Sequence, residues 1–363
     1  MSVQPSPDQS RATRYLRPDI VAMAGYTPGE QVRDCIKLNT NECAWPPSPA
    51  VLAALQVIGE DGLRLYPNPR SQAVREAAAA RYGVDASQVL VGNGSDDCLT
   101  VLYRALLAAT DTVACPWPTY GLYDDLATLQ GVRIIHADYR VDAQGWHLPA
   151  ALPRLGAKLL LVANPNNPSA TISPVAELRE LADRHDGILV VDEAYIDFAP
   201  AGSSILPHLA DHPNVVVLRT FSKSYSLAGG RLGLLFGQPA LVQHLMKVKD
   251  SYNVNYISQA IGVAALNDVD YHHALINRTL AERARLEIAL AAFGWTWAPS
   301  AANFLLCEVG ERAGELYQAL KAHGILVRYW DRVLLRTKLR ITVGRPEQND
   351  RLVALLRELI VDS

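Results

Sequence analysis

Residues 215–233 read VVVLRTFSKSYSLAGGRLG, and this stretch places an apolar run directly before a group of polar side chains. The run from Val215 to Leu218 is apolar at every position, which predicts a strand covered on both faces. Lys223 then follows between two serines, and Arg231 comes eight residues later among glycines. The stretch therefore predicts that a sheet presents one lysine and one arginine beyond the end of a strand.

Two further apolar runs, 159–163 and 188–191, precede it at intervals of about 30 residues. Between them lies PVAELRELADRHDG, which predicts a helix with Pro174 in its first position and Gly187 at its end. Strands of this kind joined by helices indicate an α/β fold with a mostly parallel sheet. Because ligands of such sheets bind at the carboxyl ends of the strands, the following segments NPNNPS, DEAY and TFSKS are candidates for a site.

The rest of the chain predicts one large and one smaller domain. SQAVREAAAARYG predicts a helix that ends at Gly83, QVLVGNG predicts a short strand, and the segment from Ser95 predicts another helix. Beyond about residue 265, strand and helix signals alternate in a pattern typical of an α+β unit. We expect an N-terminal arm that includes part of the small domain (1–60), a large domain (61–264) and a small C-terminal domain (265–363).

Composition limits the classes of partner. Of 363 residues, 49% are hydrophobic and 20% are charged, as in a globular protein, and the net charge of −3 offers no basic surface for nucleic acid. The five cysteines are scattered without a C-x-x-C pair, so we expect reduced thiols and no metal site. No signal peptide is recognisable, and no segment has the roughly 20 apolar residues that span a bilayer. We expect a cytoplasmic protein with small-molecule or protein partners and no membrane partner.

Polar residues near the predicted strand ends suggest carbonyl chemistry. Lys223, flanked by hydroxyls, can form an imine with a carbonyl compound, although a lone lysine is usually a surface residue. Asp192, at the neighbouring strand end, can hold a proton on a ring nitrogen, as pyridoxal phosphate requires; taken alone, it can equally be a loop acid. Asn167 and Tyr195 can each donate a hydrogen bond to a phenolate oxygen, but Asn167 is also an ordinary turn residue.

A second group of residues is suited to a phosphate. Ser95 opens a predicted helix, where free backbone N–H groups favour an anion, and Ser222 and Arg231 add a hydroxyl and a cation. Asp96 is acidic, so we expect its side chain to cap this helix or to order water near a ring. Tyr120 in PTYG can either stack on an aromatic ring or pack in the core.

Together these motifs resemble the fold-type-I pyridoxal-phosphate aminotransferases, and among them the histidinol-phosphate aminotransferase family. Each motif alone is weak, but they occur in the family's order and span nearly the whole chain. The matching segments are LNTNE (38–42), YPNP (66–69), GNGSDD (92–97), PTYGLY (118–123), NPNNP (164–168), VVDEAY (190–195), FSKSYSLAGGRLG (221–233) and LRITVGRPEQN (339–349). The resemblance implies a large domain with a mostly parallel central sheet and a smaller α+β domain.

The resemblance also implies a role for each residue around the cofactor, pyridoxal 5'-phosphate. Lys223 carries the cofactor covalently and, once substrate releases it, moves a proton at the substrate Cα. Asp192 pairs with the pyridinium nitrogen, while Tyr195 and Asn167 bond the ring oxygen. Tyr120 stacks on the ring. The phosphate is surrounded by Ser95, Asp96 through its backbone N–H, Ser222 and Arg231.

Substrate contacts and a partner are implied as well. Arg340 in LRITVG matches the arginine that binds the substrate anion, which is a phosphate in histidinol phosphate and a carboxylate in glutamate or 2-oxoglutarate. Arg328, Tyr26 and Asn167 match further substrate positions; Arg328 and Tyr26 can otherwise be a surface arginine and a packing tyrosine. Tyr66 in YPNP would reach the phosphate in the other subunit, which implies a homodimer with shared active sites.

The implied reaction is amino transfer from histidinol phosphate to 2-oxoglutarate in histidine biosynthesis. The chain departs from the family's NPNNPTG, because Ser169 and Ala170 replace Thr and Gly, and Ala170 must give up or tolerate a positive φ. Aminotransfer from aromatic amino acids and decarboxylation of threonine phosphate, found among relatives of the family, are alternatives. A dinucleotide-binding oxidoreductase is disfavoured because Gly92-x-Gly94 lacks the third glycine of that fingerprint. A non-enzymatic relative would have lost the lysine or the ring-nitrogen acid, and both are present.

Overall fold

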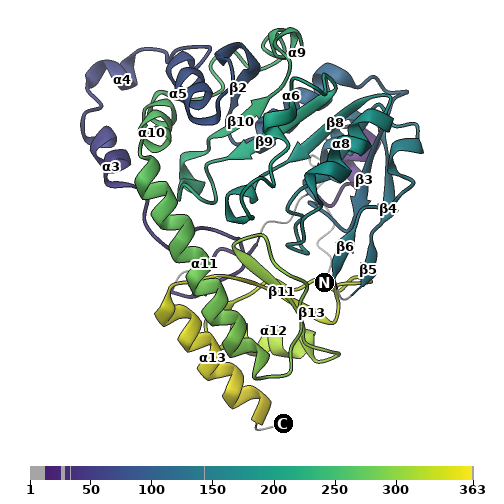
Figure 1. Cartoon of the computed structure of the whole chain (residues 1–363), viewed down its shortest axis with the longest axis vertical. Helices are drawn as coiled ribbons and strands as arrows, with labels where there is room; N and C mark the ends of the chain where they lie inside the picture. Colours follow the sequence, from purple (N-terminus) through teal and green to yellow (C-terminus); the bar gives the residue numbers. More distant parts are fainter. Residues whose placement is uncertain (1–12, 26–28, 33, 143, 362–363) are drawn as a thin grey trace.

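A computed structural model describes residues 13–25, 29–32, 34–142 and 144–361. Its main feature is a sheet of seven strands (Figure 1), in the spatial order β2 (Val89–Gly92), β10 (Gly233–Phe236), β9 (Val215–Thr220), β8 (Ile188–Asp192), β7 (Leu159–Ala163), β3 (Thr112–Trp117) and β4 (Arg133–Asp138). β10 is antiparallel to both of its neighbours, and the other paired strands run parallel. The expected α/β fold with a mostly parallel sheet is confirmed.

The apolar runs contribute side chains to two hydrophobic cores, one on each face of the sheet. Along β9, Val215 and Val217 pack into a core on one face of the sheet, while Val216 and Leu218 pack into a core on the other. Successive side chains of a strand point to opposite faces, so a strand buried on both sides is apolar at every position. This is the physical reason that the runs show no alternation of polar and apolar residues.

Helices cover both faces of the sheet. One face packs against α3 (Pro49–Gln56), α5 (Gln72–Tyr82), α8 (Val175–Arg184) and α10 (Tyr256–Asn267). The other face packs against α6 (Ser95–Leu106), α7 (Leu122–Gln130) and α9 (Pro239–Leu245). As expected, α5 ends at Gly83, whose φ of 68° is the left-handed cap conformation.

The helix between β7 and β8 is shorter than its sequence predicts. Pro174 lies just before its first turn, and the helix ends at Arg184 rather than at Gly187. The Asn214 side-chain amide donates to three carbonyl groups beyond or near this end, at 2.9 to 3.2 Å, and thereby replaces helical hydrogen bonds. Gly187 is needed for a different reason, because a Cβ there would lie 2.6 Å from the Lys158 carbonyl oxygen.

A second group of elements lies below the sheet in Figure 1, and α11 (Val269–Ala291) runs from the sheet region into it. It contains β11 (Phe304–Glu308) paired with β13 (Lys338–Thr342), α12 (Ala313–Ala322) and α13 (Pro346–Val361). β1 (Ile36–Lys37) pairs in parallel with β12 (Ile325–Leu326), and Leu38 joins the core of this group. The N-terminal arm therefore contributes a strand to the C-terminal elements.

Short elements complete the described part of the chain. These are α2 (Pro18–Ala22), α4 (Glu60–Arg64), the hairpin of β5 (Arg140–Asp142) and β6 (Gly145–His147), and the 3₁₀ turns η1 (Ala86–Gln88), η2 (Leu152–Arg154), η3 (Ile196–Phe198), η4 (Leu206–His208) and η5 (Ala228–Gly230). None of the helices within the described ranges is long and apolar enough to cross a membrane.

The sheet register aligns the strand ends that carry polar residues. Ala163 at the end of β7 is paired with Asp192 at the end of β8, and Asp192 is paired with Leu218 near the end of β9. Parallel strands thus finish at one edge, and the segments that follow them start from neighbouring positions.

Candidate active site

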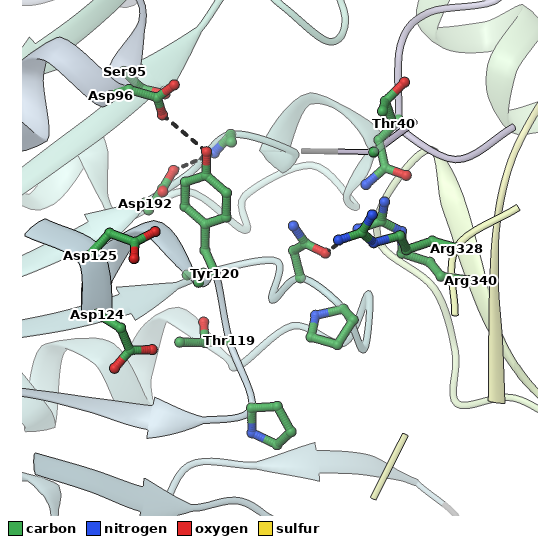
Figure 2. A pocket seen from close by; sticks show the side chains of 18 of the residues that line it. Thr40, Ser95, Asp96, Thr119, Tyr120, Asp124, Asp125, Asp192, Arg328 and Arg340 are labelled. Atoms are coloured by element: carbon green, nitrogen blue, oxygen red, sulfur yellow. Dashed lines mark hydrogen bonds between the residues drawn. The ribbon is translucent and has the colours of Figure 1, made fainter. Parts of the chain in front are cut away.

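A cleft of about 1000 Å³ lies at this carboxyl edge of the sheet. It is lined on one side by residues that follow β7, β8 and β9 and by the start of α6, and on the other by residues near β12 and β13. Figure 2 shows Asp96, Tyr120 and Asp192 on one side, with Arg328 and Arg340 facing them from the opposite side. The cleft therefore has an acidic, hydroxyl-bearing end and a cationic end.

Lys223 enters the cleft from the loop after β9. Its Nζ donates to the Thr40 carbonyl oxygen at 3.1 Å and lies 5.5 Å from the centre of the Tyr195 ring. The Tyr195 hydroxyl accepts a hydrogen bond from Asn41 Nδ2 at 3.0 Å. Because the Tyr195 oxygen accepts that bond, its own O–H proton is available to a ligand in the cleft.

Asp192 is a buried carboxylate at the floor of the cleft, with only 6% of its surface exposed. Its Oδ2 accepts from the Tyr123 hydroxyl at 3.0 Å, and its Oδ1 accepts from the Ala194 N–H at 3.2 Å. Burial raises the pKa of Asp192 to about 6, because the effect of desolvation exceeds that of these hydrogen bonds. A cation placed against this carboxylate would lower its pKa again and favour the ionised form.

The start of α6 forms a small cradle with Arg231. Gly94 precedes the helix with a φ of 90°, and a Cβ there would lie 2.7 Å from Arg231 Nη2. A Cβ on Gly233 would lie 2.3 Å from the Ser95 nitrogen, so β10 also passes close to the helix start. Free N–H groups, a guanidinium and the nearby Ser222 hydroxyl are together suited to an anion of phosphate size.

Asp96 does not cap α6, so the expectation that its side chain caps this helix is wrong, while the alternative that it orders water near a ring stays a prediction. Instead its carboxylate accepts from the Tyr120 hydroxyl at 3.2 Å and pairs with Arg231 Nη2 at 3.3 Å. The acid that supports this turn is Asp97, whose Oδ2 accepts from the Asn93 N–H at 2.9 Å. Figure 2 shows the Tyr120 ring pointing along the cleft toward Asp96.

Arg328 and Arg340 come from facing backbone positions. Each donates its backbone N–H to the carbonyl oxygen of the other at 2.9 Å, so their side chains leave the backbone side by side. The Arg340 guanidinium donates from Nη1 to Asn167 Oδ1 and from Nη2 to the Asn39 carbonyl oxygen, both at 2.6 Å. The Trp330 ring lies 5.3 Å from the Arg328 Cζ and 5.2 Å from the Arg340 Cζ, within the range of cation–π attraction.

Most of the candidate residues meet in this cleft. Its lining includes Ser95, Asp96, Tyr120, Asn167, Asp192, Tyr195, Ser222, Lys223, Arg231, Arg328 and Arg340. Tyr66 does not line it: the side chain is 79% exposed and stacks on Tyr252, with ring centroids 4.3 Å apart. Tyr26 lies outside the described residues.

The sequence motifs contain further residues of the site to which no role was given. Thr40 and Asn41, in LNTNE, hold the Lys223 amine and the Tyr195 hydroxyl. Tyr123, at the end of PTYGLY, holds Asp192. Each of these residues is a polar or aromatic residue inside a matching motif, which is a signal that the sequence offers. The site residue that each one bonds is visible only in the fold.

A family model for class I and II aminotransferases matches residues 33–356. The chain belongs to this family.

Curated relatives of this aminotransferase align over almost its whole length. Histidinol-phosphate aminotransferase 1 of Nostoc sp. is 43% identical over 353 residues, which is 96% of this chain and 99% of the relative. Histidinol-phosphate aminotransferase of Syntrophotalea carbinolica is 40% identical over 348 residues, which is 95% of this chain and 99% of the relative.

Solved structures agree with the fold of this aminotransferase. Histidinol-phosphate aminotransferase from Sinorhizobium meliloti, in complex with pyridoxal-5'-phosphate, superposes with a TM-score of 0.85 at 27% identity, covering 95% of this chain and 98% of that chain. The histidinol-phosphate aminotransferase from Clostridium acetobutylicum gives a TM-score of 0.80 at 18% identity over 90% of this chain and 99% of that chain, a likeness of fold alone. In the ranges that the structure describes, no group of three or more His, Cys, Asp or Glu side chains could hold a metal ion.

Proposed function

We propose that this aminotransferase transfers the amino group of histidinol phosphate to 2-oxoglutarate, giving imidazole acetol phosphate and glutamate in histidine biosynthesis. The observation that carries the proposal is the name shared by curated relatives that are 40% and 43% identical over nearly the whole chain. The paired arginines support it, because both substrates carry an anion close to the reacting carbon.

The cleft residues fit pyridoxal 5'-phosphate, the cofactor named for the Sinorhizobium meliloti relative. Asp192 suits a protonated ring nitrogen, since a buried carboxylate with a raised pKa is stabilised by a neighbouring cation. The helix start at Ser95, with Arg231 and Ser222, suits the phosphate. Lys223, beside Tyr195, suits the aldehyde.

When bound, pyridoxal phosphate supplies an electron sink for the bond that breaks at the substrate Cα. We assign the movement of the Cα proton to the Lys223 amine, which the Thr40 carbonyl holds within the cleft. Asp192 stabilises positive charge at the ring nitrogen. The Tyr195 O–H donates to the ring oxygen, because its lone pair already accepts from Asn41.

The other end of the cleft binds the substrate anions in turn. Arg340 and Arg328 hold the phosphate of the amino donor and then the carboxylate of 2-oxoglutarate, which a planar guanidinium can bind through two hydrogen bonds. Asn167 accepts from Arg340 through its Oδ1, so its amide nitrogen remains free to donate toward the ring oxygen. Tyr120 forms the ring's stacking partner in this assignment.

We further propose a homodimer in which Tyr66 reaches the phosphate of the partner's site. Support comes from α3 and α4, which both contact α10 and, with it, present exposed apolar side chains on one part of the molecule. These side chains are Leu52, Leu55, Val57, Leu63, Leu65, Tyr66, Tyr256 and Ile257. A second copy would cover them, and burial of apolar surface favours such association.

The division into domains and the cellular location are also proposals. The proposed parts are an arm with part of the small domain (1–60), a large cofactor-binding domain (61–264) and a small domain (265–363). The pairing of β1 with β12 supports the link between the arm and the small domain, whereas α3 packs on the large domain and α10 extends to Asn267. The five free cysteines support a reducing, cytoplasmic location.

Glutamate formation from 2-oxoglutarate by the purified holoenzyme tests the function, with histidinol phosphate, phenylalanine, tyrosine and threonine phosphate offered in parallel. We expect a large preference for histidinol phosphate in kcat/KM. Preference for phenylalanine or tyrosine would contradict the proposed donor while keeping the reaction. Release of carbon dioxide from threonine phosphate without glutamate would assign the chain to a different reaction class.

A further inference from the structure

A buried ionic network lies beside the cleft, outside the roles assigned above. The Arg219 guanidinium, on β9, donates to Glu193 Oε2 at 2.9 Å and to Asp197 Oδ1 at 3.0 Å. The Ser204 hydroxyl donates to Glu193 Oε2 at 2.7 Å and accepts from Arg219 Nη2 at 3.0 Å. The Glu193 side chain is fully buried and that of Arg219 is 10% exposed. Removing charges from water is costly even when they are paired, so a network this enclosed needs a physical reason.

One hydroxyl connects the network to the loop that carries the lysine. Ser224, which is 2% exposed, donates to Asp197 Oδ2 at 2.5 Å. Burial alone would raise the pKa of the Asp197 carboxyl, but His272 and Arg219 hold it well below its usual range. Asp197 is therefore ionised, and its hydrogen bond to Ser224 is charge-assisted and stronger than a neutral one.

The next residue of the loop is anchored as well. Tyr225 stacks on His272, with ring centroids 3.8 Å apart and planes inclined by 2°. His272 lies near the start of α11, is 3% exposed, and has its Nε2 3.7 Å from Asp197 Oδ2. Two successive residues after Lys223 are thus held by the same buried cluster, which joins the loop to α11.

Lys223 and Ser224 point to opposite sides of this loop. The Lys223 amine reaches the Thr40 carbonyl oxygen in the cleft, whereas the Ser224 hydroxyl turns inward to Asp197. A lysine stem is flexible, so the direction of its amine depends on how firmly the backbone at its base is held. The hydrogen bond of Ser224 acts at that base.

We propose that Ser224 and Asp197 are positioning residues that aim Lys223, and that Arg219 and Glu193 hold Asp197 in place for this purpose. The inference rests on the proposed cofactor chemistry at Lys223 but not on the identity of the amino donor. Without the hydrogen bond, the loop loses its inner anchor and the amine spends less time at the reacting carbon. The effect falls on kcat rather than on substrate binding.

The test compares Ser224→Ala with Ser204→Ala, because both remove a hydroxyl that bonds a carboxylate of this network and only Ser224 adjoins the lysine. In the Ser224→Ala holoenzyme we expect kcat to fall about ten- to a hundred-fold, the range for one hydrogen bond to a charged group, with the KM for 2-oxoglutarate changed less than about twofold. The visible circular dichroism of the bound cofactor, which does not depend on turnover, should change in Ser224→Ala and change less in Ser204→Ala, whose hydroxyl bonds Glu193 and Arg219 rather than Asp197. Ser224→Thr restores the hydroxyl and should recover both signals.

Thermal unfolding of each variant verifies that it is folded, and Asp197→Asn provides a second variant that keeps the side-chain shape. Equal losses of kcat in the two serine variants would overturn the proposal, because the network would then act only on stability. A wild-type spectrum in Ser224→Ala would overturn it too. A wild-type chain that takes up no pyridoxal phosphate would refute the proposed function, and this inference with it.

Discussion

The two ends of the cleft are built in different ways. Asp192 and Lys223 stand at or just after the ends of adjacent parallel strands, so the backbone pairing of β8 with β9 sets their spacing. At the other end, the Arg340 guanidinium is held by Asn167 and by the Asn39 carbonyl, which are 173 and 301 residues away in the chain. The first end takes its spacing from the pairing of two adjacent strands, whereas at the second end the direction of the Arg340 guanidinium depends on contacts from distant segments.

This difference separates chemistry from specificity. An end set by a sheet buried on both faces keeps its geometry when nearby side chains change, because the two apolar cores hold the strands. At the other end Arg340 lies on β13, but its guanidinium is held by Asn167 and the Asn39 carbonyl, so its direction changes when one of these contacts is replaced. We therefore expect substitutions at the sheet end to abolish turnover, and substitutions at the arginine end to alter which anion is accepted.

Lys223→Ala should have the largest effect, because we assign the movement of the Cα proton to the Lys223 amine. We expect the rate of amino transfer to fall at least about 10⁴-fold, the upper range for loss of a general acid–base. Lys158→Ala is the matched control, since Lys158 lies at the opposite, amino edge of the same sheet and pairs with Asp111 at 2.8 Å. Near-normal turnover in Lys223→Ala would refute the mechanism.

Asp192→Asn should have the second largest effect. We expect kcat to fall about 10²- to 10³-fold while cofactor binding is retained, because an amide cannot neutralise a charged ring nitrogen. Single-turnover kinetics with glutamate measures this loss separately from cofactor retention. An unchanged rate would remove the role of Asp192 at the ring nitrogen.

The same variant should gain stability relative to the wild type as the pH rises, when both lack cofactor. Burial raises the pKa of Asp192 from 3.8 to about 6, so the folded state binds this proton more tightly than the unfolded state. The resulting stabilisation is fully present below about pH 4 and is lost as the pH rises through about 6, an effect of about 3 kcal/mol. Asparagine does not ionise. Urea unfolding at pH 5 and pH 8 should therefore show that the free energy of unfolding of the variant, relative to that of the wild type, increases as the pH rises. A difference independent of pH would contradict this explanation.

Arg340→Lys should act on the other end, where charge is kept but the planar fork is lost. Lysine cannot bond Asn167 and the Asn39 carbonyl while also binding an anion through two hydrogen bonds. We expect kcat/KM for histidinol phosphate and for 2-oxoglutarate to fall about 10- to 100-fold, mainly through KM. Arg328→Lys should lower kcat/KM less than Arg340→Lys does, because Arg328 is more exposed than Arg340. A loss confined to kcat would contradict the view that the arginine end governs substrate binding and the sheet end governs turnover.

The contrast between the ends also explains what the sequence predicts and what it does not. The strands that bear Asp192 and Lys223 are predictable, because burial on both faces requires unbroken apolar runs and parallel strands end at one edge. The hydrogen bond between Arg340 and Asn167 is not predictable, because a local pattern does not record which distant segments meet. Asp96 illustrates the same limit: an acid in the first turn of a helix usually caps it, but here its partners are Tyr120 and Arg231, which come from other segments at the same end of the cleft.

Between the two ends runs the turn of NPNNPSA, in which Ala170 takes the place of the glycine found in the resembling family. The structure shows that the positive φ is tolerated rather than given up, since φ is 61° at Ala170. Its N–H donates to the Asn166 carbonyl oxygen at 2.8 Å, and its methyl group is fully buried beside Tyr195 and Phe304. The Cβ of Ala170 therefore has two opposite effects: it strains the backbone at this positive φ, and it stabilises the fold through buried packing.

Ala170→Gly should have the smallest effect, because these contributions nearly cancel. Relief of a left-handed conformation gains about 1–2 kcal/mol, while loss of the methyl group costs about 0.8 kcal/mol and the added freedom of glycine in the unfolded chain costs about 0.5–1 kcal/mol. We expect the free energy of unfolding in urea to stay within about 0.5 kcal/mol of the wild type. The matched control is Ala78→Gly, an equally buried alanine inside α5 with no strain to relieve, which should lose about 2 kcal/mol. Equal losses in both variants would mean that the turn bears no strain at Ala170, whereas a clear gain in Ala170→Gly would mean that its methyl group contributes little to the packing between the two ends.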